Sequence, residues 1–282
     1  MTRPVWLEAG RGAVITGGAS GIGLAMGRAL AAAGMNVLLA DSDAGRLDEA
    51  AEALGQAHPD VRIERFAVDV SRREEVEALS QSAFAAFEDI ALVMNNAGVG
   101  GGGHAFEAPD RWERVLGVNL WGVIHGVQVF TPALITQGRP AAIINTGSKQ
   151  GITSPPGDTA YNVSKAGVKT LTEGLEHSLR DLPDRKVRAH LLIPGFTFTG
   201  MTRQADKPPG AWTAEQVVDF ALERVAAGDF YILCPDNEVS RKLDEARIAW
   251  AAGDLIENRP PLSRWSPEWR EAFAAFLAEQ GL

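Results

Sequence analysis

The chain has 282 residues, of which 45% are hydrophobic, as is typical of a globular protein with a substantial core. Its net charge of −9 and lack of Lys/Arg runs argue against nucleic acid as the main partner, because phosphate binding needs a basic surface. The single Cys234 excludes an internal disulfide, and the five histidines are too scattered along the chain to suggest a metal site. We find no apolar run long enough to span a bilayer and no signal-peptide region. We therefore expect a soluble, cytoplasmic protein with no metal site and no membrane partner.

Short apolar runs alternate with longer helical patterns along the chain. In order, the runs are GAVITG from 12, NVLLAD from 36, RIERFAVDV from 62, IALVMNNAG from 90, AAIINTGS from 141, VRAHLLIPG from 187 and FYILCPD from 230. Because they are continuously apolar, we expect strands buried on both faces. Capping boxes at Ser71–Glu74 and Thr213–Gln216 indicate helix starts between them. The alternation predicts an α/β fold, a doubly wound, Rossmann-type parallel sheet of about seven strands with helices on both faces.

No repeat, low-complexity tract or linker divides the chain, so we expect one domain over residues 1–282. After about residue 196 the chain becomes rich in Thr, Gly and Pro, which predicts a substrate lid over about 196–225. Beyond residue 236 a helical segment followed by a Pro- and Trp-rich one predicts a C-terminal extension, about 237–282, packed on the main domain.

The stretch TGGASGIG at 16–23 joins the first expected strand to the first expected helix. A helix N-terminus offers free N–H groups to a phosphate, and glycines let the backbone approach a pyrophosphate. A flexible turn with helix-packing glycines is an equally good interpretation of this stretch alone.

The end of the second strand favours the nucleotide interpretation. Asp41 follows Gly23 at about the distance at which a carboxylate hydrogen-bonds the adenosine ribose and repels a 2′-phosphate. No Arg or Lys directly follows Asp41, and Ser20 in the turn is not basic, so we expect NAD(H) rather than NADP(H). The alternative is that Asp41 simply starts the next turn.

The segment YNVSK places Tyr161 and Lys165 four residues apart, on one face of an expected helix. Ser148 ends the fifth strand, at the carboxyl edge of the sheet where open α/β folds bind ligands. A solvated surface pair is the alternative interpretation of the tyrosine and the lysine.

Six motifs then occur in one order: TGxxxGxG at 16–23, NNAG at 95–98, Asn119 in VNLWG, Ser148, Tyr161xxxLys165 and Pro194–Gly195. Together they resemble the short-chain dehydrogenase/reductase family over about residues 11–200. The chain departs from many members of that family by continuing well beyond the last expected strand.

The resemblance implies four catalytic residues. Tyr161 would exchange a proton with the substrate oxygen while hydride moves between the substrate carbon and nicotinamide, and Ser148 would hydrogen-bond that oxygen. Lys165 would contact the nicotinamide ribose and, at about 4 Å, would lower the tyrosine pKa by about three units from its usual value near 10. Asn119 would hold a water that links Lys165 to solvent.

The resemblance also extends the cofactor site. Asp69 and Val70 would flank the adenine, and Thr197 and Thr199 would hold the carboxamide. The full set of candidate NAD contacts is Gly17, Ser20, Gly21, Ile22, Gly23, Asp41, Asp69, Val70, Asn96, Gly98, Tyr161, Lys165, Pro194, Gly195, Thr197 and Thr199.

The candidate substrate contacts are Ser148, Gln150, Ile152, Tyr161 and Trp212. Arg203 and Lys207 in the lid could bind an anion, but solvated surface charge is the more ordinary interpretation. We therefore expect a fairly apolar, uncharged secondary alcohol or ketone as the small-molecule substrate.

These features predict an NAD-dependent oxidoreductase that acts on a secondary alcohol or ketone. One alternative is a non-catalytic NAD(H)-binding regulatory protein of the same fold, and another is a related enzyme that uses NAD for epimerisation or dehydration. Members of the family commonly form dimers or tetramers, and the apolar stripe in SKAGVKTLTEGLEHSL is compatible with a homodimer or homotetramer.

Overall fold

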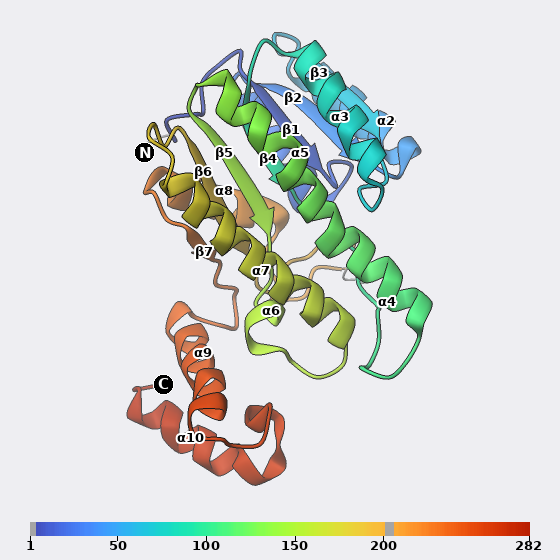
Figure 1. Cartoon of the computed structure of the whole chain (residues 1–282). Helices are drawn as coiled ribbons and strands as arrows, with labels where there is room; N and C mark the ends of the chain where they lie inside the picture. The colour runs from blue at the N-terminus through green and yellow to red at the C-terminus, as the bar shows by residue number, and fades with distance from the viewer. Residues whose placement is uncertain (1–3, 201–205) are drawn as a thin grey trace.

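Seven strands form one sheet at the centre of the molecule (Figure 1). The computed structural model describes residues 4–200 and 206–282. The strands are β1 (Gly12–Thr16), β2 (Asn36–Asp41), β3 (Ile63–Ala67), β4 (Ile90–Asn95), β5 (Ala141–Thr146), β6 (Val187–Ile193) and β7 (Tyr231–Leu233). All neighbours pair in parallel, in the order β3-β2-β1-β4-β5-β6-β7, which confirms the predicted Rossmann-type sheet. The order reverses between β1 and β4, where such sheets bind their ligands.

Helices connect the strands and cover both faces of the sheet (Figure 1). They are α1 (Gly21–Ala32), α2 (Ala44–Ala57), α3 (Arg73–Ala86), α4 (Pro109–Leu116), the π-helical turn η1 (Gly117–Trp121), α5 (Gly122–Gln137), α6 (Gln150–Thr153), α7 (Thr159–Arg180), α8 (Ala214–Ala226), α9 (Arg241–Ile256) and α10 (Arg270–Glu279). One core cluster joins α1, α2 and α8 to the sheet, and the other joins α3, α5 and α7 to its opposite face. Within β1, Ile15 belongs to the first cluster and Val14 to the second, as the alternation of side chains along a strand requires.

The edge strand β3 departs from the expectation of burial on both faces. None of its five residues is fully buried, and Arg65 and Ala67 are exposed. At this end of the sheet β3 has a neighbour on one side only, β2, so less of its surface is covered.

The two expected capping boxes have different outcomes. Thr213 and Gln216 form a complete capping box at the start of α8, as predicted. Ser71 does not cap α3, which begins at Arg73 after the N-cap residue Arg72. Instead, the N–H and hydroxyl of Ser71 donate hydrogen bonds to Oδ1 of Asp69 at 3.0 and 2.7 Å, a local turn that competes with capping.

The expected lid over 196–225 separates into two parts. Its second half is α8, whose residues Val217, Val218 and Ala221 are buried in the core, where α8 packs beside α1. Residues 196–200 and 206–213 precede that helix, and residues 201–205, including Arg203, lie outside the described part of the chain.

The stretch from α4 to α5, Pro109–Gln137, is long and apolar enough by length and composition to cross a membrane, although the sequence had not indicated such a segment. Its Val123, Phe130 and Leu134 are buried against the sheet in the core shared with α3 and α7. This packing is that of a core helix.

The C-terminal extension has an aromatic cluster of its own. Trp250 on α9 is buried, and its ring lies 5.2 Å from that of Phe273 and 5.3 Å from that of Phe276, centre to centre. Its indole N–H donates to Oγ of Ser263 at 2.8 Å. Figure 1 shows α9 and α10, in red, reaching beyond the end of the sheet near α6, which α9 contacts.

Candidate active site

The carboxyl ends of β1, β4 and β5 are joined by Asn96, which directly follows β4. Its side-chain amide donates to the carbonyls of Thr16 and Gly17 at 3.2 and 3.4 Å, and its side-chain oxygen accepts from the Thr146 hydroxyl at 3.1 Å. The Thr16 hydroxyl in turn accepts the N–H groups of Asn96 and Ala97. Asn96 therefore fixes the glycine turn relative to the strands on either side of the switch point.

The glycines of the turn are constrained partly by the protein itself. Gly17 has φ of +66°, and a Cβ there would lie 2.9 Å from Cα of Ala97. A Cβ on Gly23 would overlap the carbonyl oxygen of Gly17. At Gly21, with φ of +53°, the only described atoms within 4 Å of an added Cβ are those of Thr199. Gly17 and Gly23 thus close the turn, and Gly21 borders open space.

The start of α1 lies at this turn. Ser20 is its exposed N-cap residue, and its side chain makes no capping hydrogen bond, while Ile22 packs partly buried against the core. The first-turn N–H groups of α1 therefore donate no hydrogen bond to the Ser20 side chain, an arrangement that suits an anionic group.

Asp41, at the end of β2, holds the glycine turn from the side. Its Oδ2 accepts the N–H of Ala19 at 3.1 Å, and its Oδ1 accepts the N–H of Asp43 at the same distance. The carboxylate is therefore placed beside the turn, where a ribose bound to that turn would lie.

Two further cofactor candidates follow β3. Asp69 is exposed, and Val70 is buried against α5, where a Cβ on Gly122 would lie 2.6 Å from a Val70 methyl. Val70 therefore spaces α5 from the loop, and Asp69 presents its carboxylate to solvent.

Ser148 and Tyr161 are brought together at the end of β5. Their side chains are hydrogen-bonded to each other, and Ser148 Oγ also accepts the N–H of Gln150 at 3.1 Å. Tyr161 lies in the first turn of α7, where Asp158 caps the helix by accepting the tyrosine N–H at 3.2 Å.

Lys165 lies one helical turn after Tyr161 and is only 3% exposed. Its Nζ donates to the carbonyl of Thr146 at 2.8 Å and lies 5.7 Å from the centre of the tyrosine ring. A Cβ on Gly98 would be 3.8 Å from the same Nζ, so the NNAG turn reaches the lysine.

Burial controls the protonation of both groups and corrects one expectation. It lowers the pKa of Lys165 to about 8 and raises the pKa of Tyr161 above its usual value of 10. The hydrogen bond from Ser148 opposes the rise, and the charge of Asp158 adds to it. The pKa of Tyr161 therefore shifts in the direction opposite to the one expected from Lys165, because burial is the largest cause and the Lys165 Nζ donates to the Thr146 carbonyl.

Asn119 lies in the π-helical turn that precedes α5. It is fully buried in η1, where its Oδ1 accepts the N–H of Val99 at 2.7 Å and its Nδ2 donates to the Val99 carbonyl at 2.8 Å and to Ser164 Oγ at 3.2 Å. These hydrogen bonds involve the side-chain amide, and the expected water link from Asn119 to Lys165 stays a prediction. Asn119 positions the loop after the NNAG turn against α7.

The segment after β6 carries the remaining cofactor candidates. Pro194 accepts the N–H of Lys149 through its carbonyl at 3.3 Å. Gly195 has no room for a side chain beside Lys149. Thr197 is buried and donates to the Gly195 carbonyl at 3.2 Å, and Thr199 lies beside Gly21.

The expected substrate contacts are not all brought to one place. Gln150 is exposed and Ile152 partly buried on α6, directly after Ser148. The ring of Trp212 instead packs edge-on against Phe220, 5.8 Å between centres, and against the core under α8. Trp212 is partly buried by this packing, and its contact with substrate stays a prediction.

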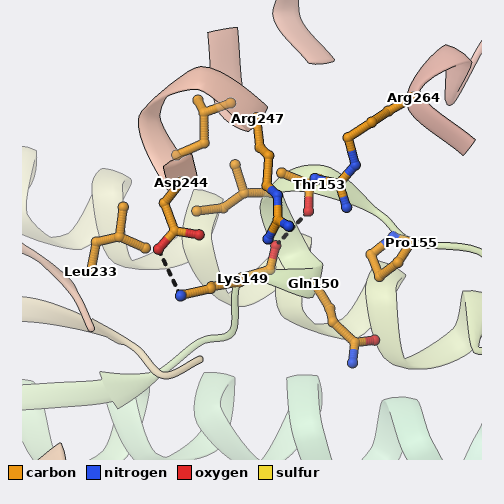
Figure 2. Close-up of a pocket in the computed structure, with 10 residues that line it drawn as sticks. Lys149, Gln150, Thr153, Pro155, Leu233, Asp244, Arg247 and Arg264 are labelled. Carbon is orange, nitrogen blue, oxygen red and sulfur yellow. Dashed lines mark hydrogen bonds and ion pairs between the residues drawn. The ribbon is translucent and has the colours of Figure 1, made fainter. Parts of the chain in front are cut away.

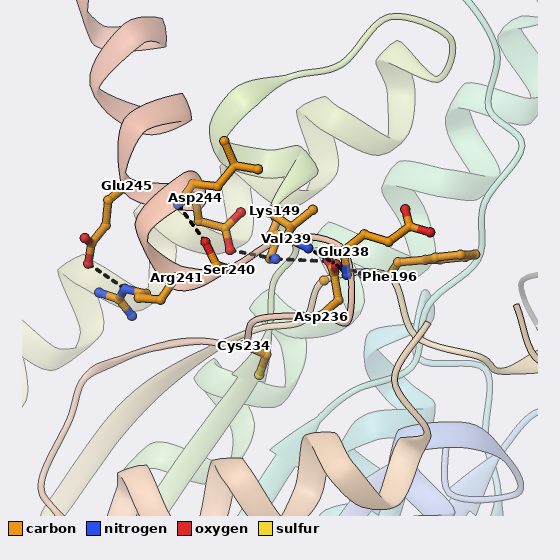
Figure 3. Close-up of polar contacts among 12 residues, drawn as sticks. Lys149, Phe196, Cys234, Asp236, Glu238, Val239, Ser240, Arg241, Asp244 and Glu245 are labelled. Atoms are coloured by element: carbon orange, nitrogen blue, oxygen red, sulfur yellow. Dashed lines mark hydrogen bonds and ion pairs between the residues drawn. The ribbon is translucent and has the colours of Figure 1, made fainter. Parts of the chain in front are cut away.

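An ion cluster beside Ser148 was not predicted (Figure 3). Nζ of Lys149 lies 3.2 Å from Oδ2 of Asp236 and 2.6 Å from Oδ2 of Asp244, and all three side chains are largely buried. Asp244 belongs to α9, so the C-terminal extension is ion-paired to the residue that follows Ser148. No local sequence pattern links these residues, because they meet only through the tertiary fold.

Comparison with known proteins agrees with this site. Residues 11–210 match the family model described as short chain dehydrogenase. The chain is 33% identical over 265 residues to 1-deoxy-11-beta-hydroxypentalenate dehydrogenase of Streptomyces arenae, covering 90% of this chain and 93% of that one. It is 34% identical over 210 residues to galactitol 2-dehydrogenase (L-tagatose-forming) of Cereibacter sphaeroides, covering 73% and 79%.

Solved structures show the same likeness. A short-chain dehydrogenase/reductase from Burkholderia phymatum in complex with NAD superposes with a TM-score of 0.81 at 35% identity, covering 90% of this chain and 96% of that one. The protein belongs to the short-chain dehydrogenase/reductase family, and it is an NAD(P)-binding oxidoreductase that acts on alcohols or ketones.

Proposed function

We propose that the protein is an NAD-dependent dehydrogenase that transfers hydride between nicotinamide and a fairly apolar secondary alcohol or ketone. The observation that carries this proposal is the hydrogen-bonded pair of Ser148 and Tyr161, with buried Lys165 behind it, at the carboxyl edge of the sheet. The two relatives named above are both dehydrogenases of hydroxylated compounds by name.

The residues at the glycine turn fit the cofactor. Gly21 borders space that a side chain would fill, the first turn of α1 is open to a pyrophosphate, and Asp41 lies beside both. Asp41 would bind the ribose hydroxyls and repel a 2′-phosphate, which favours NAD(H), and the Burkholderia structure is a complex with NAD.

In the reaction, the nicotinamide supplies or accepts the hydride. Tyr161 holds the proton that the substrate oxygen gains or loses, and Ser148 hydrogen-bonds the same oxygen and fixes its position. Because burial raises the pKa of Tyr161, its phenol is protonated at neutral pH and acts directly as the acid for ketone reduction. Alcohol oxidation needs the phenolate, which becomes more available as pH rises.

Lys165 completes the proton path. Its pKa of about 8 lets it exchange protons near neutral pH, and its buried Nζ faces both the tyrosine ring and the end of β5. Asn119 links the loop after NNAG to α7 through its hydrogen bonds with Val99 and Ser164, and so positions the helix that carries the lysine.

The exposed apolar residues of α5 and α7 support a homo-oligomer. Trp121, Ile135 and Val163 are exposed on or next to these neighbouring helices, where a second copy could cover them. A single buried cysteine supports a reducing, cytoplasmic location.

The proposal is tested by incubating the protein with NAD and a panel of secondary alcohols, and by measuring NADH and ketone separately. We expect equal amounts of both. Conversion of an alcohol without net NADH would indicate epimerisation or dehydration, and NADH binding without any conversion would indicate a regulatory protein.

The cofactor preference has its own test. Asp41→Ala combined with Ser42→Arg should shift the ratio of NADPH to NADH affinity by about tenfold or more, because a charged hydrogen bond is lost and a phosphate partner gained. An unchanged ratio would show that Asp41 is not the ribose partner.

A further inference from the structure

A cavity lies between α6 and α9 (Figure 2). Neither Ser148 nor Tyr161 lines it, but two of the expected substrate contacts, Gln150 and Ile152, do. Its volume is about 160 Å³, enough for several water-sized groups. One wall is formed by residues that follow Ser148, among them Lys149 and Ile152, and the other by the C-terminal extension, which contributes Asp244, Arg247 and Arg264.

The charges at this cavity do not balance. Three cationic side chains and one carboxylate line it, and Lys149 is already paired with Asp244 and Asp236. Within residues 4–200 and 206–282, neither Arg247 nor Arg264 has a carboxylate partner within 4 Å. Within that part of the chain, neither guanidinium therefore has an ion-pair partner at this cavity, and the only carboxylate whose charge acts on both is Asp244, which is already paired with Lys149.

Arg264 shows the imbalance most clearly. Its Nη1 is buried and has no hydrogen-bond partner among the described residues, and its guanidinium is held over the ring of Trp265, 3.9 Å from the centre. Burial, together with the charge of Arg247, lowers the pKa of Arg264 to about 10. A buried guanidinium N–H group with no acceptor is unfavourable unless a ligand supplies one.

We propose that this cavity binds the carboxylate of a small organic acid between Arg247 and Arg264. The planar fork of an arginine matches the two oxygens of a carboxylate, and two arginines can bind both sides of it. Ile152, Leu233 and Ile248 line the same cavity and would contact the hydrocarbon part of the acid. A fully hydrated inorganic anion would leave these apolar walls unused.

The site adjoins the proposed active site through the chain. Lys149 lines the cavity, pairs with Asp244 on α9 and directly follows Ser148. The carboxylate could therefore belong to the substrate itself or to a separate acid that binds beside it. The proposal of an acid site does not rest on the proposed dehydrogenase activity.

Binding is tested with butyrate and benzoate, by calorimetry and by the rise in Tm, with chloride at equal ionic strength as reference. We expect Arg264→Gln and Arg247→Gln each to weaken carboxylate binding by about tenfold or more, as expected for loss of a charge-assisted hydrogen bond. Arg241→Gln is the matched control, because Arg241 lies on α9 as Arg247 does, is exposed and is paired with Glu245. It should leave the affinity unchanged.

The Tm without ligand separates binding from a merely structural role. Arg264→Gln should change the Tm in chloride little, because it removes a partly buried cation whose Nη1 has no hydrogen-bond partner among the described residues. If Arg264 were only structural, the substitution would lower the Tm both in chloride and in carboxylate. Should Arg264→Gln fail to fold, Arg247→Gln gives the same test. No carboxylate binding by the unmodified protein beyond that of chloride, or equal loss in Arg241→Gln, would overturn the proposal.

A turnover arm distinguishes the two sources of the carboxylate. If it belongs to the substrate, Arg264→Gln raises KM for hydroxy acids and leaves KM for uncharged alcohols unchanged. If it belongs to a separate acid, KM for both kinds of alcohol stays the same while butyrate binding is lost. Either result supports the site. The calorimetric measurement of butyrate and benzoate binding tests the site even if no alcohol is turned over.

Discussion

Two regions of the molecule, the carboxyl edge of the sheet and the junction with the C-terminal extension, are each stabilised by a different kind of interaction. At the edge, Ser148 and Tyr161 are hydrogen-bonded to each other, and Lys165 donates to the carbonyl at the end of β5 without a carboxylate partner among the described residues. The extension is joined at α6 by charges, with Lys149 between two buried carboxylates and two arginines beside it. Substitutions at the edge should therefore remove chemistry, and substitutions at the junction should change stability and binding.

The largest expected effect is at the edge. Tyr161→Phe removes the group that exchanges the proton and should lower kcat by about 10²- to 10⁴-fold, with the Tm unchanged. Tyr231→Phe is the matched control, because Tyr231 is the only other tyrosine, is exposed and donates to Glu173. Equal losses of activity in the two variants would contradict the role of Tyr161.

At the junction we expect a loss of stability instead. Lys149→Met leaves Asp236 and Asp244 buried without their cation and should cost about 3 kcal/mol of unfolding free energy, measured by urea denaturation. Lys186→Met, at an exposed pair with Asp184, should change it by less than about 0.5 kcal/mol.

The same variant has a pH signature. Burial already raises the pKa of Asp244, so the folded state binds its proton more tightly than the unfolded chain does. Without Lys149 this difference grows, and part of the lost stability should return as pH falls. A loss independent of pH would mean that packing, rather than the uncompensated carboxylate, is responsible.

The glycine turn gives a smaller effect on stability. Gly23→Ala places a methyl against the Gly17 carbonyl and should cost about 1–3 kcal/mol, measured in the same way. Gly55→Ala in α2, where an added Cβ meets nothing within 4 Å, should be neutral or stabilise by up to about 1 kcal/mol. Similar costs at both positions would show that the overlap with Gly17 is not the cause.

The protonation state of Tyr161 gives an effect on rate alone, without any substitution. Because the pKa of the phenol is raised above 10, alcohol oxidation should increase about tenfold per pH unit through the alkaline range, while ketone reduction stays high at neutral pH. Steady-state kcat/KM in both directions measures this. A plateau of the oxidation rate near pH 7 would show that the tyrosine pKa is lowered in the working enzyme.

The parts of the fold that depend on local patterns could be predicted from the sequence. The seven apolar runs became the seven strands, and the spacing of Tyr161 and Lys165 placed both on α7 near Ser148. In a parallel sheet the carboxyl ends of the strands meet at one edge, so residues far apart in the chain converge there without further information.

The contacts that depend on tertiary packing could not be predicted. The partners of Asn119 depend on the π-helical turn, and Trp212 could equally have faced a ligand or the core. The direction of the Tyr161 pKa depends on how deeply it is buried. Lys149 and Asp244 meet only because α9 returns to α6, and neither residue carries a sequence signal for the other.

The most direct test of hydride transfer at the sheet edge uses a secondary alcohol deuterated at the carbinol carbon. With NAD and the unmodified protein we predict that deuterium appears on the reduced nicotinamide, one atom for each ketone formed, and that Tyr161→Phe forms this product far more slowly. Deuterium appearing in water, or ketone forming without label on the nicotinamide, would contradict the proposal that this site is a hydride-transferring dehydrogenase.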